Sequence, residues 1–355
     1  MTHKIPPKKV NNGVKPDVLL TSGFASAVKR YGKSLDTSVL GRDFTKRRQE
    51  HDHLESIVLR LNCFIETLTS CPICSSANLE PFYVFYGLRY AECNECGHLF
   101  GLDQINDEGL KILYSSEESA HSHINYFDEE QFRKRAEAIE FPKVGFVADY
   151  IKPEPGKAWL DIGASVGRLV MAAQQMGWMA RGIDADPSAV AFAQKHGLNV
   201  SEQYITKDNA AECLQNVQIV SLLEVLEHLK NPLELLSAVA GGLGNGSWIL
   251  IGVPRHPSLT AFAMRAMPEN AARHIHAMHI HLFSDQSLEF ILHKAGFEAK
   301  AVWYFGLDYV ETLSILHMTH HCEVPQILLN SIEHVQETID VCGLSESMLV
   351  LAQRN

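Results

Sequence analysis

Four cysteines arranged in two pairs constrain this chain more than any other feature of its sequence. The first pair is Cys71 and Cys74, the second is Cys93 and Cys96, and residues 75–92 lie between them. A zinc ion takes four soft ligands in a tetrahedron, and a Cys-x-x-Cys turn presents two thiolates together. The sequence therefore predicts a structural zinc site in which all four ligands are cysteines, so that no coordination position is open to a substrate.

The residues around this quartet predict a zinc ribbon over residues 71–100. Gly97 follows the second pair, where glycine suits a turn that aims amide groups at the sulfurs. Residues 79–93 alternate in polarity and are rich in Tyr, Phe and Val, which is typical of strands. A redox-active dithiol and a site without metal are the alternatives. The other cysteines follow no pairing pattern, which indicates a reducing compartment and no disulfide framework; they are Cys63, Cys213, Cys322 and Cys342.

The composition is that of a globular protein. The chain has 355 residues, of which 46% are hydrophobic and 21% charged, so it is long enough for two domains and a large core. No apolar run reaches the roughly 18 residues that cross a bilayer, and the N-terminal residues lack the apolar segment of a secretory signal. We therefore expect a cytoplasmic protein without a membrane partner.

Charge is distributed unevenly along the chain. Residues 1–48 hold eleven Lys and Arg against three acids, whereas the whole chain has a net charge of −11. A basic arm can bind nucleic acid. We favour a solvated, flexible arm, or one that packs on its own acidic body, because no aromatic residues are interleaved with the basic ones. Nucleic acid is thus not the expected partner.

Beyond the ribbon, strands and helices alternate. A short apolar strand ends at Asp161, a turn containing Gly163 and Gly167 follows, and a helix is predicted from about 168 to 176. A second strand then closes on Asp184. Strand, glycine turn, helix and strand form one half of a doubly wound α/β nucleotide-binding fold.

The glycine turn argues against a dinucleotide ligand. The G-x-G-x-x-G pattern lets the backbone approach a pyrophosphate, but this turn reads Gly163-Ala-Ser165-Val-Gly167. The loop contains no phosphate-binding lysine, and Asp161 at its start would repel a pyrophosphate and attract an amine. These features indicate a ligand that carries both an adenosine and a positive charge, which is S-adenosylmethionine.

Residues 140–300 resemble the class I S-adenosylmethionine-dependent methyltransferases. Besides the acidic residue, glycine turn and second acid, residues 217–232 read VQIVSLLEVLEHLKNP. This segment is similar to the fourth strand and following helix of ubiquinone-biosynthesis O-methyltransferases. The resemblance implies a Rossmann-like seven-stranded methyltransferase sheet. Ser165 departs from it, because the family has its middle glycine there, and this narrows the approach of the backbone to the cofactor.

The resemblance also implies a set of cofactor-binding residues. Asp161 and Gly163 would lie by the methionine moiety, and Asp184 would accept both ribose hydroxyls. Capping of the next helix is the alternative role for Asp184, although Asp186 followed by Pro187 suits that cap better. The full set is Asp161, Gly163, Ala164, Gly167, Asp184, Ala185, Leu223 and Glu224.

Two further groups raise the question of a second metal. Glu224, Glu227 and His228 have helical spacing, and the similar E-x-x-E-H of ubiquinone O-methyltransferases implies a divalent ion. Local helix contacts are the alternative that we favour. The four histidines of the second group lie close together in the chain and could bind a metal or line a polar lid; they are His274, His276, His279 and His281.

The same histidines supply a candidate general base. Class I enzymes often place His-x-x-x-Phe at the mouth where the acceptor meets the methyl group, and His279 with Phe283 fits that pattern. A histidine titrates near neutrality, as deprotonation of a hydroxyl or amine requires. We expect His279, with His281 as the second candidate, to be catalytic. Deoxysugar C-methyltransferases have Tyr-Glu before this histidine, whereas Ala277 and Met278 stand here, which disfavours carbon methylation.

A zinc ribbon ahead of a methyltransferase fold is itself similar to the arrangement in deoxysugar C-methyltransferases, where the N-terminal module helps to form the substrate side. The expected organisation follows the chain. It comprises a basic arm (1–48), a helix (49–70) that docks on the core or forms a homodimer surface, the ribbon (71–100), a helical connector (101–151), and the methyltransferase domain (152–355), which opens with a linker at 152–157 and ends in a C-terminal extension.

These expectations combine into one hypothesis and two alternatives. The hypothesis is methyl transfer from S-adenosylmethionine to a small acceptor, such as a sugar, sugar nucleotide or natural-product intermediate, at oxygen or nitrogen. A zinc-ribbon adaptor that binds nucleic acid or protein with a non-catalytic cofactor fold is the first alternative. Methylation of RNA or protein is the second, but no Asn-Pro-Pro-Tyr-like motif follows the fourth strand, where the sequence is LLEVLEH.

Overall fold

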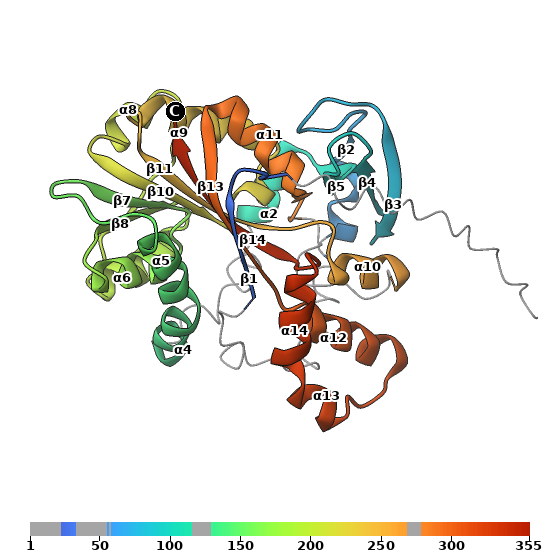
Figure 1. Ribbon diagram of the computed structural model, residues 1–355. Coiled ribbons are helices and arrows are strands. Elements are labelled where there is room, and N and C mark those ends of the chain that lie inside the picture. Colours follow the sequence, from blue (N-terminus) through green and yellow to red (C-terminus); the bar gives the residue numbers. More distant parts are fainter. Residues whose placement is uncertain (1–22, 33–54, 57, 116–128, 268–277) are drawn as a thin grey trace, which may run out of the picture.

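The computed structural model describes residues 23–32, 55–56, 58–115, 129–267 and 278–355. One sheet dominates the described part of the chain, in the order β1-β13-β14-β11-β10-β7-β8-β9 (Figure 1). All neighbouring strands run parallel except β14, which is antiparallel to both β11 and β13. The strands are β1 (Val28–Tyr31), β7 (Ala158–Ile162), β8 (Met179–Asp184), β9 (Val200–Glu202), β10 (Val217–Leu223), β11 (Trp248–Pro254), β13 (Phe297–Phe305) and β14 (Ser347–Arg354).

Both faces of this sheet are buried, as a mostly parallel sheet requires. Successive residues of one strand belong to different cores: Leu160 packs in one apolar cluster, and its neighbour Trp159 packs in the other. The helices that follow or precede these strands are α4 (Glu129–Arg135), α5 (Phe141–Ala148), α6 (Arg168–Gln175), α7 (Pro187–Lys195), α8 (Ala210–Cys213), α9 (Pro232–Gly242) and α11 (Asp285–Ala295).

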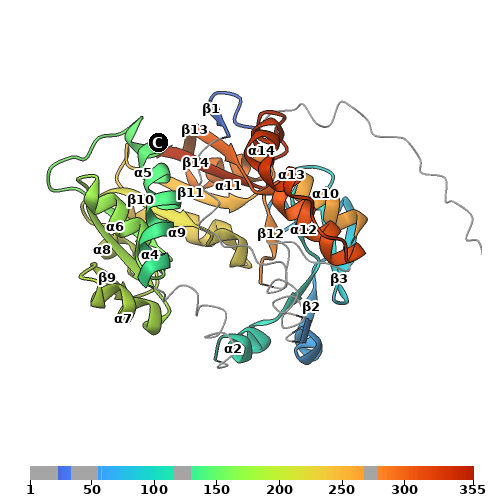
Figure 2. The same ribbon diagram turned by 90° about the horizontal axis from the view of Figure 1, so that it is seen from below.

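A second sheet is built on the cysteine quartet. It has four strands in the order β12-β5-β4-β3, with β3 (Leu79–Phe85), β4 (Leu88–Cys93), β5 (Leu99–Gly101) and β12 (His281–Leu282). Figures 1 and 2 show this sheet beside the main one, on the side away from β8 and α6. Its edge strand β12 comes from the distant C-terminal half of the chain. The amide of Phe283, directly after β12, donates to Pro254 O of β11 at 3.0 Å, so β12 joins the two sheets.

The remaining described elements cover the flanks. β2 (Ile65–Thr67) pairs with β6 (Asp103–Ile105), and α2 (Asp107–Ser115) follows. Helix α10 (Leu259–Ala266) follows β11, whereas α12 (Asp308–His320), α13 (Gln326–Asn330) and α14 (Ile332–Val341) lie between β13 and the final strand (Figure 2). None of the helices within the described ranges is long and apolar enough to cross a membrane.

The main sheet contains the seven expected strands, and the expectation of a flexible arm over residues 1–48 is corrected for residues 23–32. Residues 28–31 add an eighth strand, because β1 pairs parallel to β13. The side chain of Phe24 is fully buried, and Arg30 stacks over the Trp303 ring at 4.4 Å. Part of the basic segment is therefore built into the fold. The rest of it lies outside the described residues.

Two expected boundaries are also corrected. Residues 58–60 are helical, but the chain then turns and extends into β2, because β2 finds a partner in β6; the helix therefore does not reach residue 70. The methyltransferase domain was expected from residue 152. However, Val144 and Phe146 of α5 are buried in the same core as Trp159 and Trp303, so this domain includes at least α5.

Candidate functional site

The predicted cofactor residues meet at one edge of the main sheet. Asp161 lies in β7, Asp184 ends β8 and Leu223 ends β10, and these strands are parallel neighbours. The carboxyl ends of parallel strands form one edge, where open α/β sheets bind their ligands. β7 is also the strand at which the order reverses, since β8 and β10 lie on its two sides.

The turn after β7 depends on glycine at its two ends. Gly163 and Gly167 have φ values of 76° and 79°, in the left-handed region where a Cβ is unfavourable. A Cβ on Gly163 would lie 2.6 Å from Val225 Cγ2. Ser165, at the position of the family's middle glycine, also adopts a positive φ of 48°. Ala164 is buried below the turn, so it packs against the sheet.

Asp184 organises the glycine turn from the neighbouring strand. Its Oδ2 accepts from the Ser165 amide at 2.6 Å, and its Oδ1 accepts from the Asp186 amide at 2.8 Å. Each carboxylate oxygen has a second lone pair for another donor. The alternative role of helix cap belongs to Asp186, whose carboxylate accepts from the Ser188 amide at the start of α7. Ala185 between them is exposed.

Asp161 is held in a buried chain of hydrogen bonds. Trp159 Nε1 donates to Ser221 Oγ at 2.9 Å, and Ser221 Oγ donates to Asp161 Oδ1 at 2.6 Å. Burial raises the pKa of Asp161 to about 7, against the opposing effect of the Ser221 hydrogen bond. Sequence analysis missed Ser221 and Trp159. They lie on separate strands, and only the pairing of β7 with β10 brings them together.

Sequence analysis also missed an ion pair beside Asp161. Lys143 Nζ lies 3.2 Å from Glu140 Oε2, and both side chains are almost buried, at 12% and 11% exposure. Glu140 ends a π-helical turn (Ala136–Glu140) before α5, a feature that often marks functional sites. The charge of Glu140 raises the pKa of Asp161 and that of Lys143 lowers it, so both act on the same carboxyl. No motif marks either residue in the sequence.

The segment after β10 borders the same carboxyl edge of the main sheet. Glu224 has a φ of 55°, and its amide donates to Gly252 O of β11 at 2.9 Å. The side chain of Glu224 is exposed at this edge, whereas Glu227 is fully buried in the short turn η6 (Leu226–His228). Leu223, at the end of β10, is half-buried.

The four predicted zinc ligands form one cluster. The sulfurs of Cys71 and Cys96 are 3.7 Å apart, and those of Cys74 and Cys93 are 3.5 Å apart. Four sulfurs at about 2.3 Å from a central zinc would be separated by about 3.8 Å, so the donor set fits that ion. The Gly97 amide donates to Cys93 O at 2.8 Å with Gly97 at a φ of 64°, which closes the second turn.

A second possible metal site combines both histidine-bearing segments. Ligand atoms of Glu227, His228 and His279 all lie within 4.8 Å of one another. His228 Nδ1 lies 2.9 Å from Met278 O and must donate to it, so His228 could bind a metal only through Nε2. Among the described residues, neither carboxylate oxygen of Glu227 has a hydrogen-bond partner, and burial raises the pKa of Glu227 well above the usual range. The third member of this group is His279, where the sequence suggested Glu224.

The structure separates the two candidate catalytic histidines. His279 is half-buried beside His228, with ring centroids 4.6 Å apart. His281 is fully buried, its Nε2 lies 2.8 Å from Leu229 O and its Nδ1 lies 3.0 Å from His98 Nε2. Burial lowers the pKa of His281 to about 4. His281 therefore has no free ring nitrogen for an acceptor, which argues against the catalytic role expected for it. His274 and His276 lie outside the described residues.

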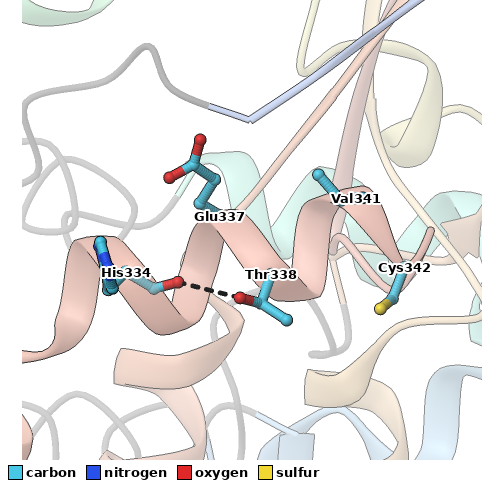
Figure 3. A pocket seen from close by; sticks show the side chains of 5 residues that line it. All are labelled: His334, Glu337, Thr338, Val341 and Cys342. Atoms are coloured by element: carbon cyan, nitrogen blue, oxygen red, sulfur yellow. Dashed lines mark hydrogen bonds between the residues drawn. The ribbon is translucent and has the colours of Figure 1, made fainter.

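A surface hollow occurs elsewhere, on α14. It is lined by His334, Glu337, Thr338, Val341 and Cys342, which project from one helix and its C-terminal cap (Figure 3). Thr338 Oγ1 donates to the carbonyl of His334 one turn earlier, at 3.2 Å. None of the predicted site residues contributes to this hollow.

The sheet order, the glycine turn and the acids of β7 and β8 are those of a doubly wound α/β fold that binds its ligand at the carboxyl edge of the sheet. Residues 142–302 match the family model described as "Methyltransferase domain". The chain is 30% identical over 145 residues to a ubiquinone biosynthesis O-methyltransferase of Stutzerimonas stutzeri, which covers 39% of this chain and 62% of that protein. It is 32% identical over 115 residues to the protein of that name from Pseudomonas fluorescens strain Pf0-1, which covers 31% of this chain and 50% of that protein.

Comparison with solved structures gives matches of low sequence identity. The S-adenosylmethionine-dependent methyltransferase from Archaeoglobus fulgidus has 20% sequence identity and a TM-score of 0.41, and the match covers 65% of this chain and 100% of that one. The chain spans less than two thirds of the length of the two curated relatives named above. The cysteine cluster lies before the residues that match the family model.

Proposed function

We propose that the protein transfers a methyl group from S-adenosylmethionine to a small-molecule acceptor. The observation that carries the proposal is the pair of carboxylates at the strand-order reversal, Asp161 and Asp184, with the glycine turn between them. A pair of acids suits a ligand with two hydroxyls at one end and an ammonium and a sulfonium at the other. The match of residues 142–302 to the methyltransferase domain supports the same activity.

The charges around Asp161 suit the amino acid end of the cofactor. Lys143 can pair with the cofactor carboxylate, and Asp161 can accept from its ammonium. Asp184 would accept from the ribose hydroxyls through the lone pairs that its backbone contacts leave open. The exposed Ala185 would flank the adenine, and Glu224 would face the methionine moiety from the end of β10.

The acceptor is proposed to be a sugar, a sugar nucleotide or a natural-product intermediate, methylated at oxygen or nitrogen. The relatives named as O-methyltransferases support oxygen as the methylated atom. His279 would remove the acceptor proton, and the methyl group would pass in line from sulfur to the acceptor. Since the sulfonium is already activated, alignment of the two groups supplies most of the rate enhancement.

One observation favours a second role for His279. The buried carboxylate of Glu227, which has no hydrogen-bond partner within the described ranges, lies beside His228 and His279, and these three side chains fit a divalent ion. An ion held by these three side chains would lower the pKa of an acceptor hydroxyl. The residues of this chain would then hold and orient the acceptor oxygen, and the proton would leave from that oxygen.

The cysteine cluster is proposed to hold structural zinc. Sulfur spacing and burial support this assignment, and four protein ligands leave no position for a substrate. In the proposed organisation the ribbon stands on the acceptor side, and the main sheet holds the cofactor.

Calorimetry with S-adenosylhomocysteine at several pH values tests the proposed function. Ionised Asp161 should bind the ligand ammonium, whereas the protonated carboxyl should not. Because the pKa of Asp161 is raised to about 7, the dissociation constant should fall as the pH rises through that value. Linkage predicts binding about tenfold weaker at pH 6 than at pH 8. Folded, zinc-replete protein that binds no S-adenosylhomocysteine at either pH would favour the adaptor instead.

Ser221→Ala provides the matched variant for this experiment. The loss of its hydrogen bond should raise the pKa of Asp161 further, so the pH at which binding is half-maximal should move upward. Ser237→Ala removes an exposed serine on α9 and should leave the profile unchanged. If Ser221→Ala and the wild type had the same pH profile of binding, Asp161 would not be the group whose ionisation controls binding of the ligand.

His279→Ala should lower kcat by about 100-fold with the acceptor, as loss of a general base does. The affinity for S-adenosylhomocysteine should change little, because His279 lies on the acceptor side. Metal analysis of the wild type and of His279→Ala distinguishes the general-base role from the metal-ligand role. Only the ligand role predicts that the wild type holds a divalent ion besides zinc and that the variant loses it. Full turnover by the variant across the pH range would exclude both roles.

A further inference from the structure

The ribbon is joined to the methyltransferase domain by polar contacts as well as by β12. Ser284 Oγ, at the start of α11, donates to Cys96 O. His256 Nε2, just after β11, lies 3.2 Å from Glu92 Oε1 of the ribbon strand β4. A third set of contacts runs deeper, through two fully buried histidines, His98 of the ribbon and His281 of β12.

The donor and acceptor of each hydrogen bond in this third set can be assigned by starting from its last member, the carbonyl of Leu229. Leu229 O is a carbonyl and can only accept, so His281 Nε2, at 2.8 Å, carries the proton and donates. His281 Nδ1 must then accept from His98 Nε2 at 3.0 Å. His98 Nδ1 then carries no proton and can only accept, so the Ser287 hydroxyl, 3.2 Å away, donates to it in place of Ser284 O, which lies at 3.1 Å. The result is a directed chain, Ser287 to His98 to His281 to Leu229, which we name the histidine relay.

The relay ends at the turn that borders both halves of the proposed site. Leu229 follows η6, which carries Glu227 and His228, and Glu227 O accepts from the Ile280 amide at 2.9 Å. On the other side, Val225 packs so closely on the glycine turn that a Cβ on Gly163 would approach it to 2.6 Å. A shift of this segment would therefore move residues that face the cofactor as well as residues that face the acceptor.

The relay begins beside the cysteine cluster. His98 stands two residues after Cys96, and its carbonyl accepts from the Cys93 amide at 2.9 Å. The backbone of His98 is thus held by the same turn that presents the second pair of cysteines. Every polar atom along this path has a partner, so removal of one ring would leave a buried nitrogen unsatisfied, which is costly.

We infer that His98 and His281 are positioning residues, through which the cysteine module sets the conformation of residues 224–229 at the edge of the cofactor and acceptor sites. The inference rests on the proposed function for its consequence in binding, but on the contacts alone for the coupling. By this inference, the ribbon positions residues 224–229 in addition to forming part of the substrate side. His281 then acts at a distance from the methyl transfer and does not touch the reacting atoms.

The test compares an apolar and a conservative replacement of His98 in the full chain. His98→Leu breaks the relay, whereas His98→Gln retains one donor for His281 and one acceptor for Ser287. His293→Leu, an exposed histidine on α11, is the control. Zinc content, the amide resonances of residues 224–229, the ring N–H resonance of His281 and the dissociation constant of S-adenosylhomocysteine are measured for each protein.

We expect zinc to be retained in all four proteins, the amide and ring resonances to shift in His98→Leu, and S-adenosylhomocysteine to bind about tenfold more weakly there, the effect of one unsatisfied buried group. His98→Gln should restore both readouts to near the wild-type values. Unchanged resonances and affinity in zinc-replete His98→Leu would overturn the inference. If wild type binds no S-adenosylhomocysteine, the proposed function fails, while the resonances still decide the coupling.

A second pair of variants covers the case in which His98→Leu loses zinc. His281→Leu and His281→Gln break and preserve the relay from the side of β12, away from the cysteines. The same contrast is expected between them: shifted amides for residues 224–229 and weaker binding in the leucine variant, and recovery in the glutamine variant. Equal behaviour of these two variants would contradict the inference.

Discussion

Replacing Asp184 with alanine should weaken the binding of S-adenosylhomocysteine by about 1,000-fold, because two hydrogen bonds to a charged acceptor contribute about 1.5–3 kcal/mol each. The variant also loses the acceptors of the Ser165 and Asp186 amides. The glycine turn would then lose its anchor to β8 in addition to the ribose contact. Isothermal titration of the zinc-replete protein measures the effect.

Two further variants separate these losses. Asp184→Asn keeps one oxygen acceptor and should bind with intermediate affinity. Asp186→Asn changes the neighbouring acid, which caps α7 and has no proposed ligand contact; since asparagine caps as well as aspartate, binding should stay within about threefold of the wild type. Wild-type affinity in Asp184→Ala would remove Asp184 from the cofactor site and with it the strongest support for the proposed function.

Replacing Cys93 with serine should release zinc and lower the melting temperature by about 10 °C or more, because structural zinc contributes several kcal/mol to folding. Cys93 is fully buried at the end of β4, and its sulfur lies 3.5 Å from that of Cys74. Loss of the ion would leave three thiolates without a counter-charge in the ribbon core. Elemental analysis and thermal denaturation measure the two effects.

Cys63→Ser is the matched control for this experiment. Cys63 is exposed and lies outside the cluster, so its replacement should change stability by no more than about 0.5 kcal/mol and leave one zinc per chain. Zinc retained at one equivalent by Cys93→Ser would show that the quartet is not the site. Equal melting temperatures with and without zinc would show that the ion does not stabilise the fold.

The sequence predicted those parts of the fold and of the site that short motifs encode. The Cys-x-x-Cys spacing identified a cluster that the structure brings together, and the alternation around Asp161 and Asp184 predicted two parallel neighbours in an α/β sheet. Both signals are local, because a knuckle and a strand–turn–helix unit are each formed by consecutive residues.

The parts that the sequence did not predict depend on contacts between distant segments. Residues 28–31 form a strand only because β13 offers them an edge. Ser221 matters because pairing of β10 with β7 places it against Asp161. His279 and His281 looked equivalent in the sequence, and only the pairing of β12 with β5 buries His281.

Because residues 281–282 form β12, the edge strand of the ribbon sheet, the ribbon is not an independent module of consecutive residues. During synthesis, the four cysteines emerge well before residues 281–282, so the cysteine cluster can form while its sheet still lacks the edge strand. An excised segment covering residues 71–101 would expose the open edge of β5. The ribbon sheet is therefore complete only when both segments, residues 71–101 and 281–282, are present in the folded chain.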